Sequence, residues 1–290
     1  MFDDAASFDR AIKRAIKASG KNPGEAYRQM LRDRFLCRVF INSSQYVLKG
    51  GSGMLARITD SRTTRDIDLD LVEKASAEVV IQDLKTMVER DMGDWCRFVL
   101  DKYEETPDEN GYSRLLKLRF SSYIGEQEKD PILIDLSLGS VITDSPQKIT
   151  PVSRVEVDEL AVSDYLVYPI ADHIAEKVCA VVEQHNGRSS SRVKDLVDLV
   201  MIALHETVLG SKLQTALRSE FAKRQLAMIA SFRIPDTWIT QYPKVARQTF
   251  LEEPYLNSDS AVKLVRKMID PALRNLVTRK QWSPVEQSWL

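Results

Sequence analysis

The hydrophobic and polar positions follow different periods in the two halves of the chain. In the first half, runs of alternating residues predict strands at 45–49, 66–71, 112–120 and 132–138. After about Pro151 the apolar positions recur every three or four residues and predict helices at 171–183, 192–205, 211–227 and 260–269. We therefore expect an α/β (α+β) fold, in which a mixed sheet with flanking helices precedes a C-terminal helical lobe.

Helices are also predicted before and between the strands, at 8–19, from Met54 and at 75–92. Another begins at Asn22, where an N-cap residue is followed by Pro23 at the first helical position and by Glu25 three residues after the cap. The stretch HNGRSSS at 185–191 predicts a loop between two helices.

Composition narrows the classes of protein that fit. The 290 residues exceed a typical single core, so we expect two lobes, at 1–155 and 156–290, with one large domain as the alternative. No apolar run approaches the roughly 20 residues of a membrane span, and the N-terminus lacks the basic start and apolar core of a secretory signal. We expect a cytoplasmic protein without a membrane partner, in which Cys37, Cys96 and Cys179 are buried thiols.

Acidic residues alternate along the strand predicted at 66–71, DIDLDL. The alternation puts the acids on one face and the aliphatic residues on the other. Three acids on one face repel one another, so a cation, a basic side chain or water must offset the cost. Mg²⁺ suits this role, with Mn²⁺ as the alternative ion, because it takes carboxylate and phosphate oxygens as ligands. Asp66 and Asp68 are the candidate ligands.

DIDLDL has two other interpretations. An edge strand with a solvated acidic face is one alternative that the motif leaves open. A calcium-binding loop needs glycine at its sixth position and glutamate at its twelfth, which are Leu71 and Ala77 here. The calcium loop is therefore excluded. On the strand predicted at 132–138, the alternation of ILIDLSL places Asp135 opposite an aliphatic face.

A glycine-rich segment, GGSG, lies at 50–53 between a predicted strand and a predicted helix. Small residues there let backbone N–H groups and a helix N-terminus approach phosphate oxygens. Gly51 and Ser52 are therefore candidates for holding a triphosphate. The segment is not a P-loop, because no GK[ST] follows, and by itself it also fits an ordinary turn.

Together these elements resemble a known signature. KGGSGMLARITDSRTTRDIDLDL is similar to the polymerase-beta-like nucleotidyltransferase superfamily, in which a Gly-Ser turn precedes a strand with paired acids and a third acid follows on another strand. Asp135 in ILIDLSLG fits the third place. The resemblance implies a nucleotidyltransferase fold with Asp66, Asp68 and Asp135 as metal ligands, and with Gly51 and Ser52 as the phosphate-binding turn.

A narrower resemblance covers 49–71, 132–139 and 168–200. LARITDSRTTRDIDLDL and YPIADHIAEKVCAVVEQHNGRSSSRVKDLVDLV are similar to motifs of the AbiEii/AbiGii toxin family of nucleotidyltransferases, which includes the MenT-type toxins. The resemblance implies an NTP-using toxin of a toxin–antitoxin or phage-defence pair, with a separate antitoxin protein as partner. Some members modify the tRNA 3′ end, so RNA such as tRNA is the expected acceptor.

The second of these motifs marks residues of the helical lobe. The resemblance makes Lys177 a phosphate or nucleotide contact and marks Asp195 and Asp198. It does not decide which acid is functional, because two residues separate Arg192 from Asp195, where the family pattern has an arginine directly before the acid. On one helix the two acids share a face, and Lys177 of the preceding helix can form a buried ion pair with them. Surface charges on two amphipathic helices are the alternative.

Basic residues are the candidates for binding a polyanion locally, since a net charge of −1 creates no global attraction to nucleic acid. Arg57, Arg62 and Arg65 flank the acidic strand, and Arg192 lies in the second motif. They are candidates for neutralising a triphosphate or guiding an RNA backbone, and solvated side chains are the alternative.

We therefore expect a Mg²⁺-dependent nucleotidyltransferase that moves a nucleoside monophosphate from an NTP to RNA and releases pyrophosphate. Asp135 is expected to draw the proton from the acceptor hydroxyl, while Ser52 and Lys177 hold the pyrophosphate. Transfer to a small molecule or to a protein hydroxyl is one alternative. A catalytically silent module that binds a nucleotide or a partner protein is the other.

Overall fold

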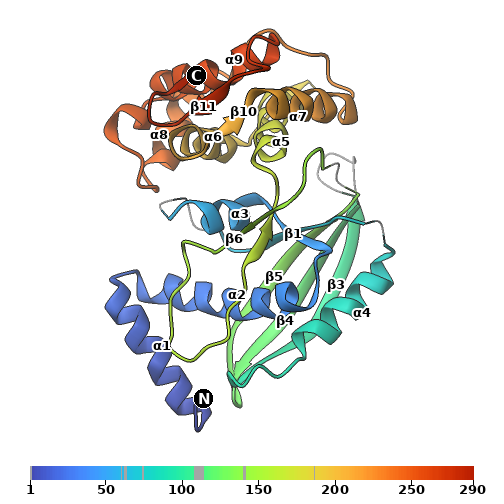
Figure 1. The fold of residues 1–290 in the computed structure, drawn as a ribbon, viewed down its shortest axis with the longest axis vertical. Coiled ribbons are helices and arrows are strands. Elements are labelled where there is room, and N and C mark those ends of the chain that lie inside the picture. Colours follow the sequence, from blue (N-terminus) through green and yellow to red (C-terminus); the bar gives the residue numbers. More distant parts are fainter. Residues whose placement is uncertain are drawn as a thin grey trace. The chain divides into compact units, whose positions relative to one another are not determined.

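The computed structural model describes residues 2–59, 61, 64–73, 75–107, 114–139, 142–185 and 187–290. The chain forms two compact units. The first comprises Met1–Arg57, Thr64–Ser140 and Gln147–Val167, and the second comprises Ile58–Thr63, Val141–Pro146 and Tyr168–Leu290. The first unit contains the large sheet, and the second is mainly helical (Figure 1).

A seven-stranded sheet forms the centre of the first unit, in the order β3-β4-β5-β2-β1-β7-β6. Its strands are β1 (Tyr46–Leu48), β2 (Ile67–Leu71), β3 (Cys96–Pro107), β4 (Arg114–Ile124), β5 (Gln127–Leu138), β6 (Gln147–Ile149) and β7 (Tyr165–Val167). β2 runs parallel to β5 and β1 runs parallel to β7, whereas the other neighbours are antiparallel. The predicted α/β fold with a mixed sheet is thus confirmed.

Helices of the first unit pack on one face of this sheet. They are α1 (Ala5–Ser19), α2 (Pro23–Asn42), α3 (Gly50–Arg57) and α4 (Ala77–Val88). α2 begins as predicted, since the Asn22 side chain accepts a hydrogen bond from the Glu25 N–H. α1 begins earlier than predicted, because Asp4 and Ser7 form a capping box before Phe8. Phe35 of α2 packs edge-on against two phenylalanines of the sheet, which fixes the core on this face.

Strands at both ends of the sheet were missed, since β6 and β7 at one end and β3 at the other were not predicted. β3 was not predicted, because its register shifts between Leu100 and Lys102 and the bulge interrupts the alternation. β4 continues past the predicted end to Ile124, and β5 begins before the predicted start, at Gln127. The predicted start of β4 at Tyr112 lies outside the described residues.

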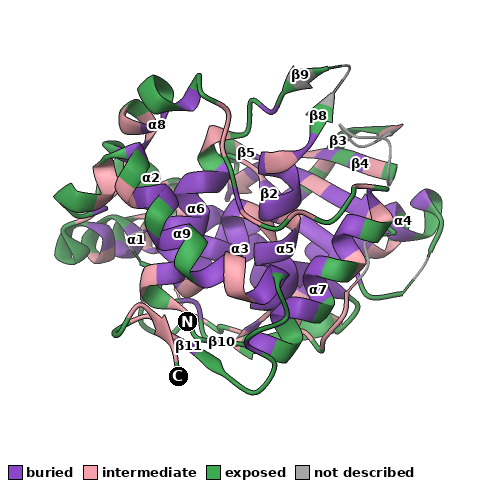
Figure 2. Cartoon of the chain, turned by 90° about the horizontal axis from the view of Figure 1, so that it is seen from above, coloured by how far each residue is buried: buried purple, intermediate pink, exposed green. Residues whose placement is uncertain are grey.

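The second unit confirms the predicted helical lobe. Its helices are α5 (Ile170–Val182), α6 (Val193–His205), α7 (Gly210–Lys223), α8 (Trp238–Ala246), the 3₁₀ turn η1 (Glu253–Leu256) and α9 (Ser258–Leu273). α5 and α6 are buried along most of their length (Figure 2). Where a loop was predicted between them, β8 (Gln184–His185) and β9 (Arg188–Ser189) form a short hairpin.

α8 and a small sheet were not predicted. The sheet consists of β10 (Val208–Leu209), β11 (Gln281–Ser283) and β12 (Ser288–Trp289), and it is anchored by Trp282, whose indole N–H donates to the Ala203 carbonyl at 2.9 Å. The three cysteines are free and buried, as predicted. Within the described parts of the chain, no helix has the length and apolar character needed to cross a bilayer.

Candidate active site

Parallel pairing of β2 with β5 places two of the predicted acids next to each other. Asp68 and Asp135 are direct partners in the register, one step beyond the pair of Ile67 with Ile134. Paired residues of neighbouring strands point to the same face, and the strands lie about 4.8 Å apart. The two carboxylates therefore share one face of the sheet. Both residues are half-buried, whereas their aliphatic neighbours are fully buried in the core.

β2 is an inner strand, since it lies between β5 and β1. The alternative of an edge strand with a solvated acidic face is therefore wrong. The last acid on that face, Asp70, is completely buried, and its Oδ2 lies 3.7 Å from Nζ of Lys49. Lys49 thus offsets part of the acidic charge that the alternation of DIDLDL creates. Its place directly before GGSG was visible in the sequence, but its pairing was not predicted.

The prediction was a separate glycine turn followed by a helix that starts at Met54. In the structure, the glycine-rich segment is itself the first turn of α3. Gly50 has a φ of +55°, and a Cβ at this position would collide with the Asp68 carboxylate. Only glycine fits both restrictions. The Gly51 N–H donates to Oδ2 of Asp68 at 3.0 Å. The N-terminus of α3 therefore contacts Asp68, one member of the acid pair, directly.

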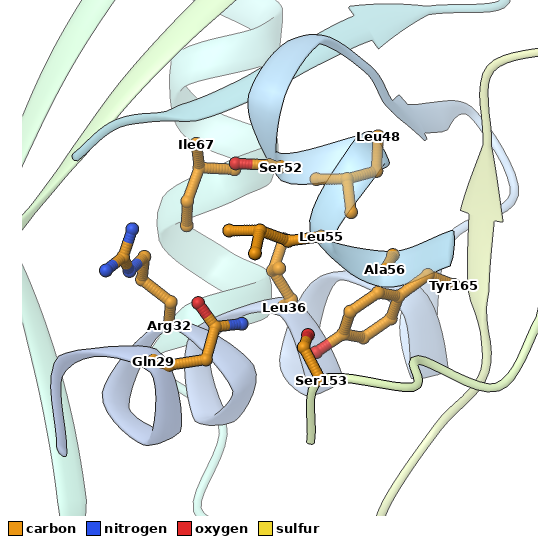
Figure 3. Close-up of a pocket in the computed structure, with 10 residues that line it drawn as sticks. All are labelled: Gln29, Arg32, Leu36, Leu48, Ser52, Leu55, Ala56, Ile67, Ser153 and Tyr165. Atoms are coloured by element: carbon orange, nitrogen blue, oxygen red, sulfur yellow. The ribbon is translucent and has the colours of Figure 1, made fainter. Parts of the chain in front are cut away.

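Ser52 is buried, and its hydroxyl donates to the carbonyl oxygen of Asp66 at 2.9 Å. This bond ties α3 to the residue that precedes β2. Behind α3, a small pocket is lined by Gln29, Arg32, Leu36, Leu48, Ser52, Leu55, Ala56, Ile67, Ser153 and Tyr165 (Figure 3). Most of these side chains are apolar, so the pocket does not suit a triphosphate. To bind a phosphate, the Gly51 N–H must release the Asp68 carboxylate, and the Ser52 hydroxyl must release the Asp66 carbonyl oxygen.

The arginines predicted around the acidic strand have different surroundings. Arg57, in the last turn of α3, donates to the side-chain oxygen of Gln147. Arg65 is exposed beside the start of β2. Arg62 lies outside the described residues. Their proposed contact with a nucleotide stays a prediction.

Arg32 of α2 is a basic residue near the acids that the sequence did not single out. It is buried and donates to the carbonyl oxygen of Thr64. Burial, together with the charge of Arg28, lowers the pKa of the Arg32 guanidinium, while the charge of Asp66 opposes this shift. The buried Arg32 guanidinium therefore interacts electrostatically with Asp66.

The donor set on the sheet fits a divalent ion through a carboxylate pair. Among the described residues, no group of three or more His, Cys, Asp or Glu side chains could hold a metal ion. Mg²⁺ usually takes one or two carboxylates and completes its shell with water and substrate phosphates, so Asp68 and Asp135 suit it. The participation of Asp66 stays a prediction.

A second cluster of predicted site residues lies within the second unit. Nζ of Lys177 on α5 lies 3.1 Å from Oδ1 of Asp195 and 2.6 Å from Oδ2 of Asp198, both on α6. Arg192 is half-exposed, and its Nε donates to Oδ2 of Asp195 at 3.0 Å. The other three side chains are buried, so the ion pair inferred for Lys177 is confirmed. The alternative of surface charges is wrong for these three residues.

Comparisons with solved structures give distant likenesses. JHP933 from Helicobacter pylori is 15% identical, with 88% of this chain and 95% of that chain covered and a TM-score of 0.43. MenT4, a nucleotidyltransferase toxin from Mycobacterium tuberculosis, is 13% identical, with 94% and 98% covered and a TM-score of 0.47. A comparison with curated proteins found no match.

The comparison with protein families is specific. Residues 34–284 match the family described as "Nucleotidyl transferase AbiEii toxin, Type IV TA system". The matched stretch contains the first turn of α3, the acids of β2 and β5, and the Lys177 cluster, and it covers most of the chain. The protein therefore belongs to the AbiEii family of nucleotidyltransferase toxins.

Proposed function

We propose that this protein is a Mg²⁺-dependent nucleotidyltransferase that moves a nucleoside monophosphate from an NTP to a hydroxyl of RNA, such as the tRNA 3′ end. The observation that carries the proposal is the pairing of Asp68 with Asp135 beside the N-terminus of α3. Adjacent carboxylates supply oxygen ligands for a divalent ion, and a helix N-terminus attracts phosphate oxygens. Family membership supports nucleotidyl transfer as the reaction.

In the proposed reaction, a bond forms between the acceptor oxygen and the α-phosphorus while the bond to the pyrophosphate oxygen breaks. When bound, Mg²⁺ neutralises charge on the phosphates. Asp66, Asp68 and Asp135 are its proposed ligands. Asp135 also accepts the proton of the acceptor hydroxyl, and the backbone of Gly51 with the hydroxyl of Ser52 positions the triphosphate. Positioning and charge neutralisation dominate this chemistry.

For the second unit, we propose that Lys177 contacts the phosphates of the nucleotide. Two carboxylates hold its ammonium at one place, which limits the entropy lost when a ligand binds. Arg192 is half-exposed and is proposed as a nucleotide contact, together with Arg57 and Arg65 of the first unit. Membership of a toxin family further implies a cognate antitoxin protein as partner.

The test is label transfer from each α-³²P-labelled NTP to total tRNA by the full chain in the presence of Mg²⁺. We expect label in RNA with the wild type and its loss in Asp68→Asn and Asp135→Asn. Asp130→Asn is the matched control, because Asp130 lies on the same strand and is exposed. Label in protein or in a small molecule would identify the other acceptor classes. Nucleotide binding without transfer to any acceptor would contradict the proposal and indicate a silent module.

A further inference from the structure

Asp66 lies just outside the strand pairing that fixes the other two acids of the sheet. β2 begins at Ile67, so Asp68 is held by its neighbours in the sheet, whereas Asp66 belongs to the segment that leads into the strand. Metal–oxygen distances tolerate deviations of only about 0.2 Å. A metal ligand in such a segment therefore needs restraints that the sheet does not supply.

Three hydrogen bonds restrain the backbone of this segment. The Ser52 hydroxyl of α3 donates to the carbonyl oxygen of Asp66 at 2.9 Å, and the Thr64 hydroxyl donates to the same oxygen at 3.3 Å. The third bond comes from α2, where the Arg32 guanidinium donates to the carbonyl oxygen of Thr64. Two helices therefore hold residues 64–66 directly before β2.

Arg32 is a buried cation that lines the same pocket as Ile67, the residue after Asp66 (Figure 3). Besides the bond to Thr64, its Nε donates to the carbonyl oxygen of Arg28 at 3.4 Å. Within the described parts of the chain, Arg32 forms no ion pair. Burial of a charge is costly, and an uncharged donor could bond the same carbonyl oxygens. The charge itself therefore calls for an explanation.

The charge of Arg32 acts on Asp66 without occupying its carboxylate. The two groups interact electrostatically but do not form an ion pair. Among the described residues, no donor forms a hydrogen bond with the Asp66 carboxylate. Arg32 thus offsets part of the repulsion between Asp66 and Asp68 and leaves the oxygens of Asp66 available to a ligand. Lys49 has the corresponding place at the other end of the acidic row, beside Asp70.

We infer that Arg32 is a positioning residue, which holds residues 64–66 so that the Asp66 carboxylate can bind the divalent ion. The inference rests on the proposed function, which assigns the ion to the sheet acids. The charge of Arg32 by itself repels a divalent cation, so removal of the charge alone would strengthen metal binding. Loss of the restraint would weaken it, because partners of metal ligands contribute about 10–100-fold to metal affinity. The direction of the change therefore separates the two effects.

The test is titration of the full chain with Mn²⁺, in which electron paramagnetic resonance measures the free ion, without NTP or RNA. We expect Arg32→Met to raise the Kd for Mn²⁺ about tenfold. Arg32→Lys, which keeps the charge and a donor, should recover part of the affinity. Arg28→Met is the matched control, because it removes a half-exposed guanidinium one turn earlier on α2 and should leave the Kd unchanged. Circular dichroism melting checks that all variants fold.

A double-mutant cycle with Asp66→Asn gives a readout that a purely structural role would not change. If Arg32 acts through Asp66, Arg32→Met should have no further effect on the Kd for Mn²⁺ once Asp66 is replaced. Equal effects of Arg32→Met in both backgrounds would overturn the inference. So would an affinity that is unchanged or higher in Arg32→Met, or a wild type that binds no Mn²⁺.

The titration contains neither NTP nor acceptor, so its outcome is separate from nucleotidyl transfer. Mn²⁺ binding that depends jointly on Arg32 and Asp66, combined with no label transfer to any acceptor, would refute the proposed reaction alone. Label transfer to RNA by the wild type, combined with independent effects of the two substitutions on the Kd for Mn²⁺, would refute the inference alone.

Discussion

The acid pair of the sheet and the lysine cluster of the helical lobe use the same chemical groups in different surroundings. Asp68 and Asp135 are half-buried, next to each other. Asp195 and Asp198 are 4% and 1% exposed, and Lys177 lies between them. A half-buried carboxylate keeps part of its hydration, whereas a buried one needs a fixed partner. The comparison teaches that the sheet acids are accessible to a ligand, while the helical lobe depends on its cluster for stability.

The largest effect is expected from Lys177→Met. The substitution leaves two buried carboxylates without the ammonium that lies between them, which should lower the free energy of unfolding by about 3–5 kcal/mol. Urea denaturation measures this change. The triple variant Lys177→Met/Asp195→Asn/Asp198→Asn leaves no buried charge of the cluster uncompensated, since Arg192 is half-exposed, and should recover part of the loss. If Lys177→Met is as stable as the wild type, the cluster does not stabilise the helical lobe, and this part of the comparison is wrong.

Asp135→Asn is expected to lower the rate of transfer strongly and to leave the stability nearly unchanged. The rate of transfer should fall about 10²–10³-fold, because charge stabilisation by a bound ion contributes several kcal/mol to the barrier. The free energy of unfolding should change by no more than about 0.5 kcal/mol, since the side chain is half-buried. Single-turnover kinetics and urea denaturation of the same preparation test both values, with Asp130→Asn as control. A loss of stability that matches the loss of rate would show that the sheet acids are structural too.

The two units also differ in how one buried acid of each, Asp94 and Asp172, makes stability depend on pH. In the first, Asp94 is bonded by Arg34 and Arg38 at 2.7 and 2.6 Å. Burial alone would raise the pKa of Asp94, but the two arginines outweigh it and hold that pKa below 3.8. In the second, burial raises the pKa of Asp172 above 3.8, against hydrogen bonds from Thr143. The arginine partners of Asp94 thus reverse the pKa shift that burial alone would cause.

The two acids should change stability with pH in opposite senses. The contribution of Asp94 is present above pH 3.8 and is lost as the pH falls through its lowered pKa. The contribution of Asp172 is present below pH 3.8 and is lost as the pH rises through its raised pKa. Urea denaturation at a series of pH values should show a slope of up to about 1.4 kcal/mol per pH unit for each group. Asp94→Asn should remove the loss of stability at low pH, and Asp172→Asn should remove the loss that occurs as the pH rises. Identical pH profiles for the wild type and both variants would contradict these two predictions.

The smallest effect is expected from Ser52→Ala. Loss of the hydrogen bond to the Asp66 carbonyl should lower the free energy of unfolding by about 1 kcal/mol. If Ser52 also contacts the triphosphate, KM for the NTP should rise in addition. Ser211→Ala, at an exposed position of α7, is the control. A change in stability without any change in KM would limit Ser52 to a structural role.

Local patterns were sufficient for the parts of the site that depend on neighbours in sequence. The alternation in DIDLDL and ILIDLSL correctly assigned the acids and the aliphatic residues to opposite faces, because successive side chains of a strand always point in opposite directions. The N-cap of α2 was equally local. The spacing of Asp195 and Asp198 correctly put both acids on the side of α6 that meets Lys177.

Pairing between distant segments was decided only when the chain folded. That Asp68 lies opposite Asp135, and Asp135 opposite Lys117, depends on strand order and register, which residues far apart in the chain determine together. The burial of Asp70 against Lys49 likewise needs a neighbouring strand. One-dimensional periodicity sets the face on which a side chain lies. It contains no term for the partner across the sheet, so the arrangement of charges around the acids belongs to the tertiary structure.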